Sequence, residues 1–508
     1  MSSVPVKPLR IVLAASEAVP FFKTGGLADV AGALTKALAD CGHEVTLIIP
    51  DYTPLRQNKA GLPAVHDTGL QFTIDMNGRS MTGEVSWARY PQSTATVLLV
   101  RQAAYFDRGQ PYGDAGGGYA DNSERFCFFS RAVPEICRLM VLRPDILHCN
   151  DWQTGLIPAL LNSRYAQIAG FEQTASVMTI HNMAYQGAFW KMDMLLTGMH
   201  WGFYNPSHME AWGSLNLLKT GLAFADQLTT VSPTYAREIC TPEGGCGLDG
   251  LLRWRQSALT GILNGIDVDV WNPATDPFLP APFSADNWQT GKARCKAHLQ
   301  QRLGLASSPR APLIGMVSRL VDQKGLDLIA GCASALLNRR VQLAFLGTGD
   351  ARYEALLRDL AKRHPEQVSA VIGFDESLAH QIEAGADLFL MPSQFEPCGL
   401  NQMYSQRYGT IPIVRQVGGL ADSVSHYDGT PAGLETATGF VFADYSMGGF
   451  TMAVEQALSA WQDAAVWNRL VRNGMHRDWS WQQSADRYVA VYHQALAKVE
   501  SRKAENRL

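Results

Sequence analysis

Short apolar runs in the first half of this chain are each followed by a polar turn and, in several cases, by a segment with helical periodicity. Buried strands give the first pattern, and helices with one apolar face give the second. Strands that alternate with helices are typical of parallel sheets covered by helices. The expected strands are 10–14, 44–49, 96–100, 145–148, 176–180 and 227–231, and the expected helices are 27–41, 153–162 and 234–239.

The stretch from residue 61 to residue 119 differs, because threonine-rich polar positions alternate there with apolar ones. A period of two is typical of strands that have one solvated face. We therefore expect antiparallel strands inserted beside the first sheet.

The strand and helix pattern restarts after a turn-rich interval near residues 262–267. The expected strands are 313–317, 342–346, 370–372, 388–391, 411–414 and 439–442, and the expected helices are 325–337, 353–363, 378–384 and 401–407. A last helix, 483–499, carries Tyr488, Val491 and Leu496, which favour packing against another surface, such as that of the first domain.

A chain of 508 residues exceeds one ordinary core, so two α/β domains are expected. We predict two doubly wound, Rossmann-like domains, 1–260 and 261–482, with a deep cleft between them. The segment 483–508 is predicted to form a helix that packs back on the first domain. Ligands in such sheets bind outside the carboxyl ends of the strands.

The composition excludes several classes of function. The chain has 46% hydrophobic and 18% charged residues and a formal net charge of −4, which disfavours broad nucleic-acid binding. No apolar run is long enough for a membrane span, and the N-terminus lacks the apolar core of a signal peptide. The 9 cysteines are scattered without a CxxC pair, which favours reduced thiols and a cytoplasmic protein.

The most informative local feature is a glycine turn, Lys23-Thr24-Gly25-Gly26, between a predicted strand and a predicted helix. Glycines let a ligand approach the backbone, and a helix N-terminus offers free N–H groups to an anion. Such turns also occur without a ligand in many α/β domains. A second copy of the pattern, Gly418-Gly419-Leu420-Ala421-Asp422, lies in the second half. The repeat favours a phosphorylated ligand that meets both domains.

Three charged residues follow predicted strands of the second half. Arg319 and Lys324 lie on one loop, where a guanidinium and an ammonium can hold a diphosphate and stabilise its charge as it departs. Two solvated surface cations would give the same pattern. Glu396 lies in an irregular turn, where a carboxylate can accept sugar hydroxyls or favour positive charge on an anomeric carbon. A carboxylate that serves only the helix dipole is the alternative.

His181 and Asp151 each follow a predicted strand of the first half. An aspartate beside an indole, as in Asp151-Trp152, suits sugar binding, because the indole packs on C–H surfaces while the carboxylate accepts hydroxyl hydrogens. His181 is either a structural histidine or a ligand-facing one.

Two further patterns suggest a cofactor but are better explained without one. The acids Asp267 and Asp269 flank a turn, where solvated carboxylates are common, so no metal site is expected. The stretch Gly347-Thr348-Gly349-Asp350 begins like a dinucleotide fingerprint, but Arg352 takes the place of the third glycine. It is better interpreted as part of a nucleotide pocket wall.

The chain closely resembles bacterial glycogen synthases and the related plant starch synthases. The resemblance runs from about Arg10 to Tyr492 and is carried, in order, by KTGGLADV, HCNDWQTGL, THNMAYQG, LNGID, VSRLVDQKGLD, PSQFEPCGLNQM, YGTIPIV and VGGLADSV. This family implies the GT-B glycosyltransferase fold, whose last helix crosses back to the first domain. It also implies a retaining transfer of glucose from ADP-glucose to the non-reducing 4-hydroxyl of an α-1,4-glucan, which elongates glycogen without a metal or other cofactor.

The resemblance also implies roles for individual residues. The expected catalytic group comprises Glu396 at the donor glucose, Lys324 and Arg319 at the diphosphate, and His181 near the donor sugar. The expected donor-binding residues are Lys23, Gly25, Gly26, Asn264, Cys398, Gly399, Leu400, Gly419 and Leu420. Asp151 lies near the donor sugar or the acceptor in this scheme, and Tyr112 is an expected acceptor contact.

Several alternatives stay open from the sequence. The motifs do not contact the base directly, so a UDP-sugar transferase on the same fold is one alternative. A glucan-binding protein without turnover is another, although the retained Lys23, Arg319, Lys324 and Glu396 argue against it. A dehydrogenase is disfavoured by the incomplete fingerprint. For retention we favour same-face attack, in which the departing diphosphate takes the proton of the incoming hydroxyl, over a covalent intermediate.

Overall fold

The computed structural model describes residues 7–57, 61–114 and 117–505, which form two α/β units. Unit 1 runs from the N-terminus to Val231, resumes at Ala236–Gly265 and takes in the C-terminal segment from Trp481. Unit 2 consists of Ser232–Tyr235 and Ile266–Ser480. The sequence predicted borders after residues 260 and 482, and the corresponding borders of the two units in the structure fall after Gly265 and Ser480. The prediction about a signal peptide falls partly on residues 1–6, which lie outside the described range.

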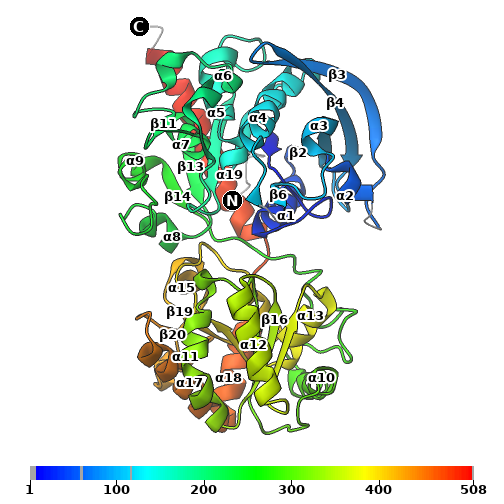
Figure 1. The fold of residues 1–508 in the computed structure, drawn as a ribbon, viewed down its shortest axis with the longest axis vertical. Coiled ribbons are helices and arrows are strands. Elements are labelled where there is room, and N and C mark those ends of the chain that lie inside the picture. The colour runs from blue at the N-terminus through cyan, green and yellow to red at the C-terminus, as the bar shows by residue number, and fades with distance from the viewer. Residues whose placement is uncertain (1–6, 58–60, 115–116, 506–508) are drawn as a thin grey trace, which may run out of the picture. The chain divides into compact units, whose positions relative to one another are not determined.

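A 9-stranded sheet forms the centre of unit 1, in the order β14-β13-β9-β8-β1-β2-β5-β4-β3. The strands from β14 to β5 pair in parallel, whereas β4 is antiparallel to β5 and β3 is antiparallel to β4. Figure 1 shows β3 and β4 as a long curved hairpin. The antiparallel insertion expected from residues 61–119 is therefore confirmed. The strands are β1 (Arg10–Ala14), β2 (Glu44–Pro50), β3 (His66–Met76), β4 (Arg79–Arg89), β5 (Thr96–Arg101), β8 (Ile146–Asn150), β9 (Ala175–Ile180), β13 (Gln227–Thr230) and β14 (Leu259–Gly261).

Helices and small sheets surround this centre. Every position of β8 and β9 is buried, as expected for parallel strands that are covered on both faces. The helices are α1 (Gly26–Asp40), α2 (Thr53–Gln57), α3 (Ala103–Phe106), α4 (Asn122–Leu139), α5 (Ile157–Leu160), α6 (Met194–Thr197), α7 (Leu217–Phe224), α8 (Pro233–Glu238), α9 (Asp249–Trp254) and α19 (Gln482–Glu505). The small strands are β6 (Gly113–Asp114), β7 (Gly117–Gly118), β10 (Ala188–Phe189), β11 (Glu210–Ala211) and β12 (Ser214–Asn216).

The prediction of a single helix at 153–162 is wrong. The chain instead forms a 3₁₀ turn (Trp152–Thr154), the short α5 and a π-helical turn (Leu161–Tyr165). The break falls at Gly155, where a Cβ atom would lie 2.1 Å from the carbonyl oxygen of Leu217. This close approach of two backbones requires glycine at the position where the 3₁₀ turn ends.

Unit 2 is built on a 6-stranded parallel sheet in the order β17-β16-β15-β18-β19-β20. Each predicted strand of the second half corresponds to one of these. The strands are β15 (Leu313–Val317), β16 (Gln342–Gly347), β17 (Val368–Ile372), β18 (Leu388–Met391), β19 (Ile411–Arg415) and β20 (Phe440–Phe442). The helices are α10 (Trp288–Leu303), α11 (Leu326–Asn338), α12 (Ala351–Arg363), α13 (Glu376–Gly385), α14 (Asn401–Arg407), α15 (Gly418–Ser423), α16 (Pro431–Leu434), α17 (Met447–Gln462) and α18 (Ala464–Met475).

The C-terminal helix α19 packs within unit 1, where Figure 1 shows it in red among blue and green elements. Tyr488 and Val491 join the core of that unit, and Leu496 packs partly buried against it. The hydroxyl of Tyr492 lies 2.8 Å from Nδ1 of His148 on β8. None of the described helices has the length and apolar character needed to cross a membrane.

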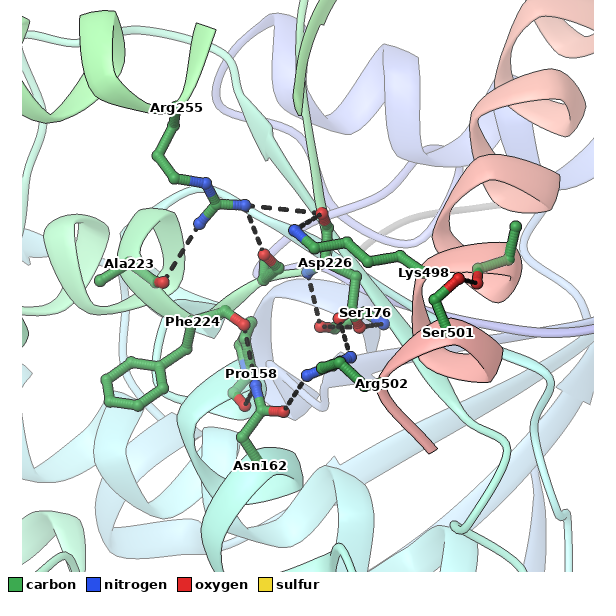
Figure 2. A network of polar contacts seen from close by, with 12 residues as sticks. Pro158, Asn162, Ser176, Ala223, Phe224, Asp226, Arg255, Lys498, Ser501 and Arg502 are labelled. Atoms are coloured by element: carbon green, nitrogen blue, oxygen red, sulfur yellow. Dashed lines mark hydrogen bonds and ion pairs between the residues drawn. The ribbon is translucent and has the colours of Figure 1, made fainter. Parts of the chain in front are cut away.

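A polar network around Asp226 holds the end of this helix (Figure 2). One oxygen of the buried Asp226 accepts from the N–H and the hydroxyl of Ser176, at 2.8 and 2.9 Å, and the other pairs with Arg502. Lys498 donates to the carbonyl of Asp226 at 3.0 Å. Arg255 donates to the carbonyls of Leu222 and Ala225, both at 2.6 Å, near the end of α7. The network thus joins α19 to β9 and to the α7 end.

Replacing Asp226 by alanine is expected to lower the free energy of unfolding of unit 1 by about 2–4 kcal/mol, because Ser176 and Arg502 lose their acceptor. Thermal denaturation followed by circular dichroism measures the shift. The control is Asp40→Ala, which removes an exposed i,i+4 partner of Lys36 and should cost about 0.5 kcal/mol or less. Equal shifts for the two variants would contradict a stabilising role for the network.

Candidate functional site

Polar residues follow three neighbouring strands of unit 1. Glu17 follows β1, Asp151 follows β8 and His181 follows β9, and these strands are adjacent in the sheet. The carboxyl ends of parallel strands meet at one edge, so these side chains gather there. The predicted residues Asp151 and His181 are in contact, since Oδ1 of Asp151 accepts from the backbone N–H of His181 at 2.7 Å.

Burial sets the charge of both residues. Asp151 is 7% exposed and has a positive φ of 54°, and burial raises the pKa of its carboxyl to about 7. The backbone N–H groups of His181 and Asn182 donate to the Asp151 carboxylate and oppose this increase in its pKa. Burial also lowers the pKa of His181 to about 3, so its ring is neutral. Nε2 of that ring lies 2.9 Å from Oδ1 of Asn150.

Tyr112 is fixed at the same edge. Its hydroxyl shares a 2.7 Å hydrogen bond with Oγ of Ser16, and its carbonyl accepts from Nδ2 of Asn122 at 2.8 Å. Burial holds the pKa of Tyr112 well above its usual value. Tyr112 therefore remains a neutral donor beside the end of β1.

The first glycine turn leaves an open face. Gly25 caps α1 with an extended φ of −156°, without a side-chain cap, and Gly26 is the first residue of the helix. A Cβ atom added at either glycine would meet nothing within 4 Å. No packing within unit 1 therefore requires these glycines, which agrees with the approach of a ligand. Lys23 is exposed and pairs with Asp29 at 2.8 Å.

Asn264 follows β14 in unit 1. It is 5% exposed, and its Oδ1 is a buried atom for which the described part of the chain supplies no hydrogen-bond partner. An acceptor of this kind is suited to a hydroxyl donor from a ligand.

The predicted ion-binding residues of unit 2 meet at the ends of β15 and β18. Nζ of Lys324 donates to Oε2 of the buried Glu396 at 2.6 Å, and Oγ of Ser393 donates to the same oxygen at 2.9 Å. Gly325 has a φ of 72°, and a Cβ there would lie 2.1 Å from the carbonyl of Pro392. The two loops are thus pressed together. Arg319 is exposed on the same loop as Lys324.

The second glycine turn, at the start of α15, packs directly under the Glu396 turn. The N–H of Gly419 donates to the carbonyls of Glu396 and Pro397, both at 3.1 Å. A Cβ at Gly418 would lie 1.9 Å from the carbonyl oxygen of Glu396, and one at Gly419 would lie 2.1 Å from that of Cys398. Unlike the first turn, this turn needs its glycines for internal packing.

The remaining predicted residues of unit 2 belong to the same cluster. Cys398 is buried, Gly399 has a positive φ of 70°, and Leu400 precedes α14. Leu420 is fully buried beneath the turn. The structure thus brings Lys324, Glu396 and these turn residues together within unit 2.

Two residues were missed by the sequence analysis. Phe374 is 89% exposed and follows β17 at the carboxyl edge of the unit 2 sheet. An apolar ring in a Gly-Phe-Asp loop after a strand is the signal that could have identified it. For Glu17, the signal that could have identified it is an acidic residue shortly after the buried strand β1. Among the described residues, no cluster of histidine, cysteine, aspartate and glutamate is arranged to hold a metal ion.

Asp151→Asn is expected to stabilise unit 1 more at pH 8 than at pH 5. From about pH 4 to 7 the carboxyl of the unfolded chain ionises while that of the folded chain stays protonated. The folded state then binds more protons, so stability falls as the pH rises and levels off above about pH 7. Asparagine does not ionise and so avoids this loss. The free energy of unfolding of the variant relative to that of the parent should therefore increase by about 1–3 kcal/mol from pH 5 to pH 8.

Thermal unfolding of both proteins at the two pH values measures this difference. Glu17 is present in both proteins and raises the pKa of Asp151 in the parent, so the difference reports the ionisation of Asp151 together with its interaction with Glu17. An equal gain at pH 5 and pH 8 would contradict the raised pKa.

Known proteins match almost the whole chain. A family model described as starch synthase catalytic domain matches residues 10–254, and one described as glycosyl transferases group 1 matches residues 300–474. A glycogen synthase of Anaeromyxobacter dehalogenans is 49% identical over 95% of this chain and 98% of its own length. Glycogen synthase 1 of Methylococcus capsulatus is 44% identical over 96% of this chain and 97% of its own length.

A solved structure agrees with these matches. The catalytic domain of starch synthase IV from Arabidopsis thaliana, bound to ADP and acarbose, has a TM-score of 0.88 and 35% identity, and the match covers 96% of this chain and 100% of that one. The predicted fold, a two-domain glycosyltransferase of the GT-B type, is therefore confirmed. The chain belongs to the glycogen and starch synthase family of glycosyltransferases.

Proposed function

We propose that this enzyme transfers glucose from ADP-glucose to the non-reducing 4-hydroxyl of an α-1,4-glucan, with retention, and so elongates glycogen. The contact between Lys324 and Glu396, seated on the second glycine turn, carries the proposal. It sets a cation suited to a diphosphate against a carboxylate suited to sugar hydroxyls. The choice of ADP-glucose rests on the starch synthase relative, whose structure holds ADP.

In unit 2, Arg319 and Lys324 bind the diphosphate in this proposal, and Glu396 faces the donor glucose. The turn from Cys398 to Leu400 meets the sugar and phosphate oxygens. Gly419 and Leu420, whose N–H groups are bonded within the protein, support that turn from below. Phe374 offers an exposed ring on which the adenine base stacks.

In unit 1, Lys23 with Gly25 and Gly26 contacts the donor through its open turn. The neutral His181 donates or accepts a hydrogen bond at the donor sugar, and Asn264 accepts from a sugar hydroxyl. The carboxyl of Asp151 and the hydroxyl of Tyr112 contact the donor sugar or the acceptor. This assignment gives each predicted residue one contact that agrees with the direction of its pKa shift, where it has one, and with its burial.

The chemistry breaks the bond between the anomeric carbon and the diphosphate oxygen and forms a bond from that carbon to the acceptor oxygen. We favour attack on the same face, so that the departing diphosphate oxygen takes the proton of the acceptor hydroxyl. Arg319 and Lys324 stabilise the charge that develops on the leaving group. The proposal needs no metal, and the nine free cysteines support a reducing, cytosolic setting.

The test of the function is an elongation assay with maltoheptaose, ADP-glucose or UDP-glucose, and EDTA. We expect maltoheptaose to grow by single glucose units from ADP-glucose, with release of ADP and no effect of EDTA. Preference for UDP-glucose would overturn the proposed donor and leave the assignment of the fold unchanged. Binding of maltoheptaose without turnover of either donor would favour a glucan-binding protein and refute the enzyme.

Lys324→Ala is expected to reduce kcat at least about tenfold, because one charge-assisted contact worth about 1.5 kcal/mol is lost in the transition state. Steady-state kinetics with ADP-glucose measure the effect. Lys362→Ala, which removes an exposed lysine of α12, is the matched control and should keep the parent kcat. Near-normal kinetics of the Lys324 variant would remove Lys324 from the mechanism.

A further inference from the structure

Glu17 is a buried carboxylate at the end of β1 that has no part in the function proposed above. It is 3% exposed, and both of its oxygens accept from Thr24. The N–H of Thr24 donates to Oε2 at 2.5 Å, and the hydroxyl lies 2.9 Å from Oε1 and 2.8 Å from Oε2. One side chain therefore engages both polar donors of the residue that stands between Lys23 and Gly25.

The charged groups that face Glu17 are carboxylates. Asp29 of α1 raises its pKa, and Glu17 in turn raises the pKa of Asp151. Burial is the main cause of the shift in Glu17, whose pKa rises to about 7, while donation from Thr24 and Tyr112 opposes it. A buried carboxyl without a cation costs stability, which a neutral residue would avoid. Costs of this kind are typical of positions that serve a function.

The loop that follows Glu17 is closed near both ends by backbone hydrogen bonds. The N–H of Phe22 donates to the carbonyl of Ala18, and that of Val19 donates to the carbonyl of Ala28, both at 3.0 Å. Between these bonds lie Lys23 and the open glycines. The contact of Glu17 with Thr24 restrains the backbone at the point where the glycines begin.

We propose that Glu17 is the positioning residue of the first glycine turn. By holding Thr24, it fixes the N–H groups of Gly25 and Gly26 and the backbone of Lys23 in the place from which they meet the donor. This inference rests on the proposed function. Thr24 itself has no free donor for the ligand, so its part is to transmit the restraint.

The kinetic test uses Glu17→Ala and Glu17→Gln with ADP-glucose and maltoheptaose. The alanine variant should lose at least about tenfold in kcat, while its KM for ADP-glucose stays within about threefold, because unit 2 supplies most of the proposed donor contacts. Glutamine retains an amide oxygen for the N–H of Thr24 and should restore kcat to within about threefold of the parent. Glu44→Gln, at an exposed position that begins β2, is the matched control.

A double-mutant cycle separates positioning from general damage. Thr24→Val removes the hydroxyl donor, and in combination with Glu17→Ala it should add less than about a twofold further loss, because both changes break the same contact. If the alanine variant does not fold, Glu17→Met takes its place in the cycle, because methionine keeps the length of the side chain and has no oxygen to accept from Thr24. Losses that multiply, or a Glu17→Ala variant with kcat within twofold of the parent, would overturn the proposal.

Amide hydrogen exchange tests the restraint without any substrate. The N–H of Thr24 should exchange at least about tenfold faster in Glu17→Ala than in the parent, while that of Val19 stays unchanged. A parent protein that fails to elongate maltoheptaose would refute the proposed function and leave this measurement intact. Unchanged exchange at Thr24 would refute the role of Glu17 even if the enzyme is active.

Discussion

Parallel pairing of neighbouring strands is the constraint on which the candidate residues of both units depend. In unit 1, β9, β8 and β1 are adjacent, so the residues that follow them meet at one edge of the sheet. In unit 2, β15, β18 and β19 are adjacent, and the loops after them carry Lys324, Glu396 and the second glycine turn. A different strand order would leave each residue at the end of its strand but would separate it from its partners.

The two glycine turns share a sequence pattern, but the physical reason for having glycine differs between them. In unit 2, Gly418 and Gly419 give room to the turn at Glu396, whose carbonyl and that of Cys398 occupy the space of a side chain. In unit 1, the space beside Gly25 and Gly26 is empty. The following aspartates differ as well, since Asp29 pairs with Lys23, whereas Asp422 accepts from the N–H and hydroxyl of Thr234. A repeated motif therefore does not establish a repeated role.

Much of the fold could be predicted because buried parallel strands are short, continuous apolar runs. Among the helices that were not predicted, α4 and α10 have buried faces that include Arg125 and Arg131 in one and Lys292 and Lys296 in the other. These cations bury their stems and donate to carbonyl oxygens, a solution that hydrophobic periodicity does not reveal. For the site, the residues at strand ends could be named in advance. The clamp between Glu17 and Thr24 depends on the path of a loop, which no local pattern encodes.

The carboxyl edges of the two sheets differ in their electrostatics. In unit 1, Lys23 is neutralised by Asp29, His181 is neutral, and burial raises the pKa values of Glu17 and Asp151 to about 7. A neutral imidazole and a carboxyl group with a raised pKa, such as those of His181 and Asp151, are suited to hydrogen bonds with the hydroxyls of a sugar. In unit 2, Lys324 pairs with the buried Glu396, and the exposed Arg319 lies on the same loop as Lys324. In the proposed function, the buried groups of unit 1 therefore serve the sugar hydroxyls, while the loop with Arg319 and Lys324 serves the diphosphate and Glu396 beside it serves the glucose.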